Sequence, residues 1–170
     1  MSYGKSLVQV LVTGVVLTAP LDTLADWQYT KWGMTAAEIV AASDGDAHLI
    51  SDVQKANRAG ENSDAIALGK FTTGPFEFDV VFRALKGGHG LDTVRLELRE
   101  PAIHRRLRDA LIGKYGIGQE TVEDIGSIKT TIIIWKAETE TVKLIHADIV
   151  VLGQELVYLD YSDSLKDLGL

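Results

Sequence analysis

The sequence predicts an α+β domain in which helices pack on one face of an antiparallel sheet. Apolar and polar side chains alternate along residues 76–85, which is typical of a strand with one buried face. Apolar side chains recur at helical spacing between Ile103 and Tyr115. The predicted order is a helix, three strands, a helix and three strands, which indicates two αβββ units on an antiparallel sheet.

The first helix is expected over residues 36–43. Thr35 and Glu38 form a T-x-x-E capping box, in which the hydroxyl accepts from a backbone N–H of the first turn and the carboxylate accepts from the backbone N–H of Thr35. Asp44-Gly45 ends this helix. Residues 44–64 are polar and are predicted as loop with room for one further helical turn.

Pro101 is expected to open the second helix, because proline is well tolerated at the first helical position, and Gly116 is expected to end it. A glycine-punctuated loop is expected over 116–128. The six predicted strands span residues 65–72, 76–85, 91–98, 130–137, 141–147 and 155–161.

Composition excludes several classes of function. A net charge of −7 and a pI near 5.0 argue against binding to nucleic acid or to anionic membranes, both of which favour a basic surface. The chain has no cysteine, so a disulfide framework, a thiolate nucleophile, a cysteine-ligated metal and a lipid-attachment cysteine are all excluded.

Residues 1–25 resemble a cleavable secretory signal peptide. Lys5 supplies the positive charge, residues 7–19 are uncharged and largely apolar, and Thr23-Leu24-Ala25 places small residues before the expected cleavage point. The sequence therefore predicts a periplasmic or secreted domain over residues 26–170, with no transmembrane segment after cleavage.

Two groups of residues are candidates for contacts with a partner. Trp27 and Tyr29 are either core residues or, if exposed, an aromatic binding anchor. Arg105, Arg106 and Arg108 form a basic cluster in an acidic chain, which is either a solvated helix face or a contact patch for an acidic partner or phosphate groups.

No catalytic or cofactor motif is present, so the leading prediction is a non-enzymatic domain without a cofactor that engages a protein partner. One alternative is a carrier of a small molecule or lipid. Its cleft would be lined by four aromatic side chains: Phe71, Phe76, Phe78 and Phe82. A weaker alternative is a metal-dependent enzyme. Its ligands would be His89, Asp92, His146 and Asp148.

The segment 26–35, with the sequence DWQYTKWGMT, resembles the mature start of a group of small exported bacterial proteins of unknown function. The Tyr115-Gly116 pair, the Trp135 strand and the Leu159-Asp-Tyr161 ending extend this likeness over most of the domain. The resemblance implies a periplasmic location and no known activity.

The shorter piece from Gly33 to Ile39 is similar to the helix start of the outer-membrane lipoprotein SmpA/OmlA family, and through it to the β-lactamase-inhibitor-protein fold. This resemblance implies helices on an antiparallel sheet and binding to other proteins. The acylated cysteine of the lipoprotein family is absent here.

Overall fold

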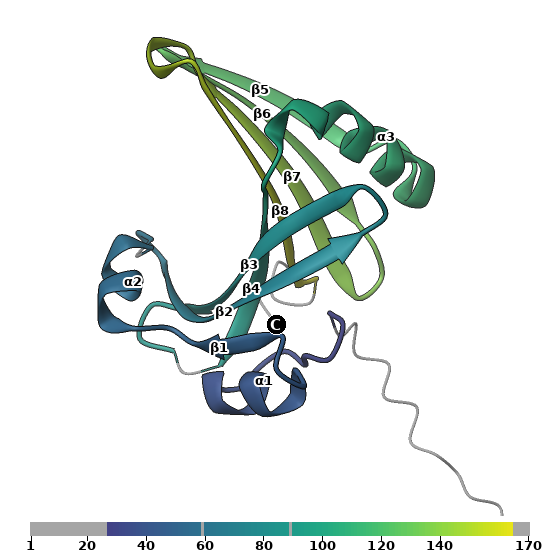
Figure 1. The fold of residues 1–170 in the computed structure, drawn as a ribbon. Helices are drawn as coiled ribbons and strands as arrows, with labels where there is room; N and C mark the ends of the chain where they lie inside the picture. The colour runs from purple at the N-terminus through teal and green to yellow at the C-terminus, as the bar shows by residue number, and fades with distance from the viewer. Residues whose placement is uncertain (1–26, 59, 89, 165–170) are drawn as a thin grey trace, which may run out of the picture.

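The computed structural model describes residues 27–58, 60–88 and 90–164. In this part of the chain, eight strands form one antiparallel sheet that twists strongly along its width (Figure 1). The predicted signal peptide lies outside the described residues, and so does His89.

The strands are β1 (Ala47–Leu49), β2 (Ser63–Thr73), β3 (Phe76–Leu85), β4 (Leu91–Leu98), β5 (Gln119–Ile125), β6 (Ile128–Lys136), β7 (Glu140–Ile149) and β8 (Gln154–Asp163). The α-helices are α1 (Ala36–Ala42), α2 (Asp52–Asn57) and α3 (His104–Tyr115). Two 3-10 turns, η1 (Pro101–Ile103) and η2 (Val150–Leu152), complete the elements.

The strand order across the sheet is β1-β2-β3-β4-β8-β7-β6-β5, and every neighbouring pair is antiparallel. Strands β4 and β8 form the seam between two groups of four strands. The sequence prediction of an α+β domain with an antiparallel sheet is therefore confirmed, but each repeated unit has four strands rather than three. Both units belong to the same sheet.

The main core lies on one face of this sheet. Ile39 of α1 and Leu107 and Leu111 of α3 belong to the same buried cluster as the aromatic side chains of β3. Helix α2 lies on the opposite face, because Arg58 at its end binds Glu97, which alternates along β4 with buried leucines. The expectation that all helices share one face is therefore wrong for α2.

The capping box of α1 is present as predicted. The backbone N–H of Glu38 donates to the Thr35 hydroxyl at 3.4 Å, and the backbone N–H of Thr35 donates to the Glu38 carboxylate at 2.8 Å. Helix α2 has an equivalent box formed by Ser51 and Gln54. This short helix and β1 occupy the segment that was expected to be mostly loop.

The predicted loop 116–128 contains strand β5, all seven residues of which are exposed. The connection to this strand is tight at Gly118, where an added Cβ would lie 2.6 Å from Ile133 and 2.8 Å from Trp135. The Trp135 indole donates to the carbonyl of Gly116 at 2.8 Å. Trp135 therefore fixes where the chain leaves α3 and enters the edge strand.

Candidate functional site

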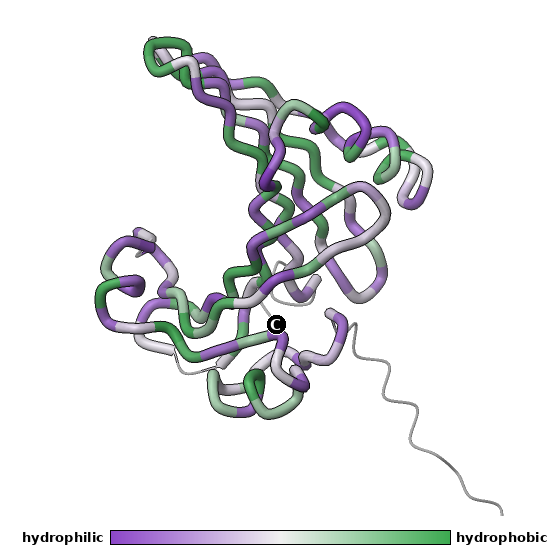
Figure 2. The backbone as a smooth tube through the Cα atoms, in the orientation of Figure 1, coloured by the Kyte–Doolittle hydropathy of each residue, from purple (hydrophilic) through white to green (hydrophobic). Residues whose placement is uncertain are grey.

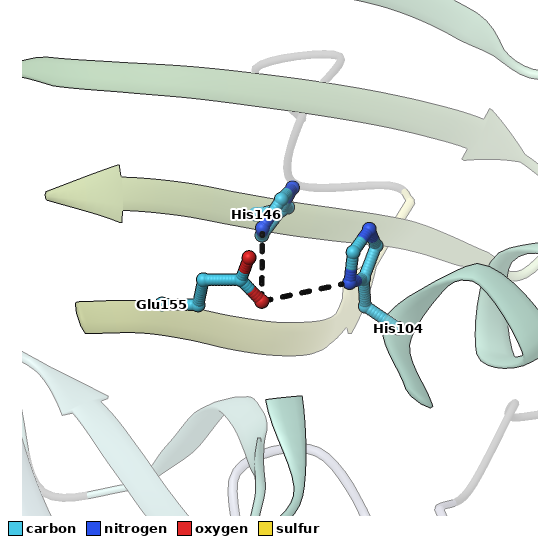
Figure 3. A group of neighbouring side chains, drawn as sticks. All are labelled: His104, His146 and Glu155. Atoms are coloured by element: carbon cyan, nitrogen blue, oxygen red, sulfur yellow. Dashed lines mark ion pairs between the residues drawn. The ribbon is translucent and has the colours of Figure 1, made fainter. Parts of the chain in front are cut away.

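Three side chains from separate elements meet beside the start of α3 (Figure 3). His104 is the first residue of α3 and follows the 3-10 turn that Pro101 begins. His146 lies on β7 and Glu155 on β8. The register pairs His146 with Val157 and Asp148 with Glu155, so these side chains share the face that α3 covers.

The three side chains are close enough to act together. A Glu155 carboxylate oxygen lies 3.8 Å from Nδ1 of His104 and 3.9 Å from Nε2 of His146. The two imidazole rings stack with their centroids 4.1 Å apart. Nδ1 of His104 also lies 3.0 Å from the carbonyl oxygen of Pro101, and this contact holds the His104 ring in place.

The environment of His146 favours a neutral imidazole. Burial and the neighbouring His104 lower the pKa of His146, and the carboxylates of Glu155 and Asp148 oppose this effect. Nε2 of His146 is buried and has no hydrogen-bond partner. A buried nitrogen without a partner is costly, so this atom is available to a ligand.

The two histidines open onto a groove of about 440 Å³ between α3 and strands β5–β7. Arg105 and Arg108 line the groove from α3, and both are exposed. The guanidinium of Arg108 donates to Glu120 at 2.8 Å, so part of the basic cluster is neutralised within the fold. Arg106 is exposed and does not line the groove.

The aromatic residues at the expected mature N-terminus lie against the core. Trp27 is 8% exposed and packs edge-on against Phe71 and Phe82, with ring centroids 5.5 Å and 5.9 Å apart. Tyr29 is half-buried beside them, and burial raises its pKa to about 12. Trp27 is therefore a core residue and not an exposed binding anchor, because β2 and β3 present an aromatic surface to it.

The alternative metal site of His89, Asp92, His146 and Asp148 is not formed by those of its members that the structure describes. Thr93, next to Asp92, pairs with Ser162 on β8, whereas His146 pairs with Val157 five positions away on the same strand. At roughly 3.3 Å per residue, the positions of Asp92 and His146 are about 16 Å apart along the strand direction. Asp148 does lie beside His146 and opposite Glu155.

Sequence reasoning identified His146 and Asp148 but missed the parts played by His104 and Glu155. His104 directly precedes the basic cluster of Arg105, Arg106 and Arg108, and Glu155 begins the last predicted strand. Two of the three side chains come from the β7–β8 hairpin and the third from α3, so no fixed spacing such as H-x-x-x-H identifies them.

A cleft of about 670 Å³ lies at the other end of α3, against the β2–β3 hairpin. Phe71, Phe76 and Phe78 line it, as the carrier interpretation expected, together with Trp27. Phe82 is fully buried and does not line it. Lys114 and Glu140 supply charged groups at the same cleft.

Comparison of the chain with protein-family models, curated proteins and solved structures finds no match. Among the described residues, none of the helices has the length and apolar character that a membrane crossing requires.

Proposed function

We propose that the chain is an exported, non-enzymatic interaction domain that binds a protein partner through the ends of its β5–β6 and β7–β8 hairpins. A group of exposed aliphatic side chains at the ends of these hairpins carries this proposal, and we call it the distal patch. Its members are Ile125, Ile128, Val150, Val151, Leu152 and Leu156. Figure 2 shows the apolar character of the β7–β8 connection at the tip of the sheet.

Backbone pairing and one hydrogen bond between the two turns bring Ile125, Ile128 and Val150 of the distal patch together. Ile125 pairs with Ile128, and Ile128 pairs with Ile149. The backbone N–H of Val150 donates to the carbonyl of Ser127 at 3.0 Å, which ties η2 to the β5–β6 turn. Exposed apolar side chains that form a contiguous surface mark interaction sites, whereas scattered ones need no explanation.

The charges beside the distal patch suggest the chemistry of the partner. On the other face of the same hairpin ends, the paired residues run Asp124, Lys129, Asp148 and Glu155 from β5 to β8. Three carboxylates therefore accompany one ammonium group, and the whole chain carries −7. An apolar protein surface bordered by basic side chains would complement this arrangement.

The outer edge of β5 offers a second element of recognition. This seven-residue strand ends the sheet and adjoins the distal patch at Ile125. An edge strand presents unpaired backbone groups to which an extended segment of another protein can add. The resemblance to the β-lactamase-inhibitor-protein fold, whose members bind other proteins, also supports an interaction role.

Site-specific photo-cross-linking in whole cells tests this proposal. A cross-linking residue at Val151 is compared with one at Val53 on α2, because the two valines are 72% and 71% exposed. We expect a discrete protein adduct from Val151 and none from Val53. The captured protein, once purified, should bind the unmodified chain and lose at least about tenfold affinity for Val151→Asp, which introduces an unpaired charge into an apolar contact.

Equal labelling at both positions, or undiminished binding by Val151→Asp, would contradict the interaction role. Adducts with lipid alone would also contradict it and would indicate a membrane contact instead.

The aromatic cleft favours a second candidate, a carrier of a small apolar molecule. Its volume of about 670 Å³ falls within the usual range of ligand sites, about 300–1,000 Å³. Ala110 lines the cleft and is exposed, so Ala110→Trp should fill it without disturbing the core. Native mass spectrometry should then detect a bound molecule on the parent chain and on the control Ala102→Trp, but not on Ala110→Trp. A parent chain without added mass counts against the carrier.

A further inference from the structure

The cluster beside the start of α3 contains two imidazole donors, His104 and His146, that no part of the interaction proposal uses. Two imidazoles and one carboxylate place one possible ligand atom each within 4.8 Å of the others. Imidazole nitrogens together with a carboxylate oxygen are ligands that suit zinc and neighbouring divalent transition metals. We propose that His104, His146 and Glu155 form a binding site for such a dication, with Zn²⁺ as its representative.

The spacing of the donor atoms is close to that of a bound ion. A tetrahedral Zn²⁺ with bonds of about 2.0–2.2 Å holds its ligand atoms about 3.3–3.6 Å apart. The two nitrogen–oxygen distances here are 3.8 and 3.9 Å. Small rotations of the Glu155 side chain shorten these two distances by the few tenths of an ångström that bonding needs, and rotation of the imidazoles brings together the two ring nitrogens, which lie within 4.8 Å of each other. Glu155 is partly exposed and is free to move in this way.

The unpartnered Nε2 of His146 is explained by this site. This ring nitrogen is buried beside the Glu155 carboxylate without a hydrogen-bond partner. An ion bound between His146 and Glu155 would satisfy both groups. Binding through Nδ1 of His104 replaces its contact with the Pro101 carbonyl.

The surrounding charges both oppose and support a cation. Arg105 and Arg108 line the same groove, but the charge of Arg108 is balanced by Glu120. Asp148 lies opposite Glu155 on β7, which brings a second carboxylate to the site. With three protein ligands, a fourth coordination position stays open for water or an anion, and the arginines would favour an anion there.

Zn²⁺ binding to the purified chain, freed of any affinity tag and of metal, tests the proposal by titration calorimetry and metal analysis. We expect one Zn²⁺ per chain. Glu155→Gln and His146→Gln should each weaken binding by at least about tenfold, since even groups that only support a ligand contribute that much. His48→Gln is the matched control, because His48 is an exposed histidine on β1, outside the cluster, and its loss should leave the affinity unchanged.

A thermal unfolding series provides the second measurement. Zn²⁺ should raise the Tm of the parent chain and of His48→Gln, because a ligand that binds only the folded state stabilises it, and should leave that of Glu155→Gln unchanged. Glu155 is partly exposed, so its glutamine variant keeps the fold and remains informative. Absence of stoichiometric Zn²⁺, or equal affinity in Glu155→Gln and the parent chain, would overturn the proposal.

Discussion

The seam between the two four-stranded units depends on an ion pair that can be weakened by a single substitution. Arg95 of β4 and Asp160 of β8 are direct neighbours in the register. The guanidinium donates to the carboxylate through Nε at 2.8 Å and Nη2 at 2.7 Å, and it also lies 4.8 Å above the ring of Tyr158. The hydrogen bond to Asp160 raises the pKa of Arg95, so the pair favours the charged guanidinium.

Asp160→Asn preserves the shape of the side chain and removes its charge. Exposed ion pairs contribute about 0.2–1 kcal/mol, whereas breaking a buried pair costs about 3–5 kcal/mol. The side chains here are 27% and 13% exposed, so this pair falls between those limits. We expect the free energy of unfolding to fall by roughly 1.5–3 kcal/mol, since a hydrogen bond to a charged group is worth about that much.

Asp79→Asn is the matched control. Asp79 of β3 accepts from Arg99, the residue after β4, at 2.6 Å, but these side chains are 43% and 40% exposed. Solvent screens this pair, so its loss should cost less than about 1 kcal/mol. Urea unfolding measures both variants, and double-mutant cycles with Arg95→Met and Arg99→Met isolate the two pair energies. Equal coupling energies would refute the argument that burial at the seam strengthens the pair.

Three further changes have predictable outcomes. Gly118→Ala should lower the Tm, because its Cβ would meet Ile133 and Trp135 at 2.6–2.8 Å. The Cβ of Gly113→Ala meets nothing within 4 Å, so this change should stabilise α3 by about 0.5–1 kcal/mol. Calorimetry compares the two variants. Thr35→Ala should cost about 1 kcal/mol in urea unfolding through loss of the α1 cap, and Thr35→Ser should restore most of it. Burial raises the pKa of Tyr29 and of Tyr115 to about 12, above an unfolded value of about 10. The folded state therefore holds these protons more tightly, so the free energy of unfolding should fall as the pH rises from about 10 to 12. In a pH titration, the tyrosinate absorbance of the folded chain should appear at a higher pH than that of the urea-unfolded chain.

Elements with a strong local pattern could be predicted from the sequence. The segment 76–85 alternates over its first half, where one side of β3 faces the core, and its predicted bounds coincide with the strand although residues 80–84 are buried on both faces. The helix around Leu107 and Leu111 shows helical spacing because only that side of α3 is buried. In α3 and in the first half of β3, a single buried face leaves its period in the sequence.

Elements that bury little could not be predicted in this way. Strand β5 is exposed along its whole length, so its sequence, QETVEDI, carries no alternation, and only pairing with β6 makes it a strand. The histidine–glutamate cluster has the same origin. Its members meet because the β7–β8 register and the start of α3 bring them together, and neither relation can be read from local spacing.

The two units of the sheet are arranged alike but are covered differently. Each unit has a helix before its outermost strand, α1 before β1 and α3 before β5, and both helices pack into the same core. On the opposite face of the first unit, α2 lies over the sheet and the preceding Ile50 packs against a small buried cluster around Val81. Among the described residues, no helix covers that face of the second unit, where Ile132, Ile145 and Tyr158 form a half-buried row across β6, β7 and β8. This row continues toward the distal patch along the same side of the strands, because residues two apart share a face. The apolar surface that the first unit covers within its own chain is thus left open in the second, and this difference between otherwise similar halves is the strongest structural reason to look for a protein partner there.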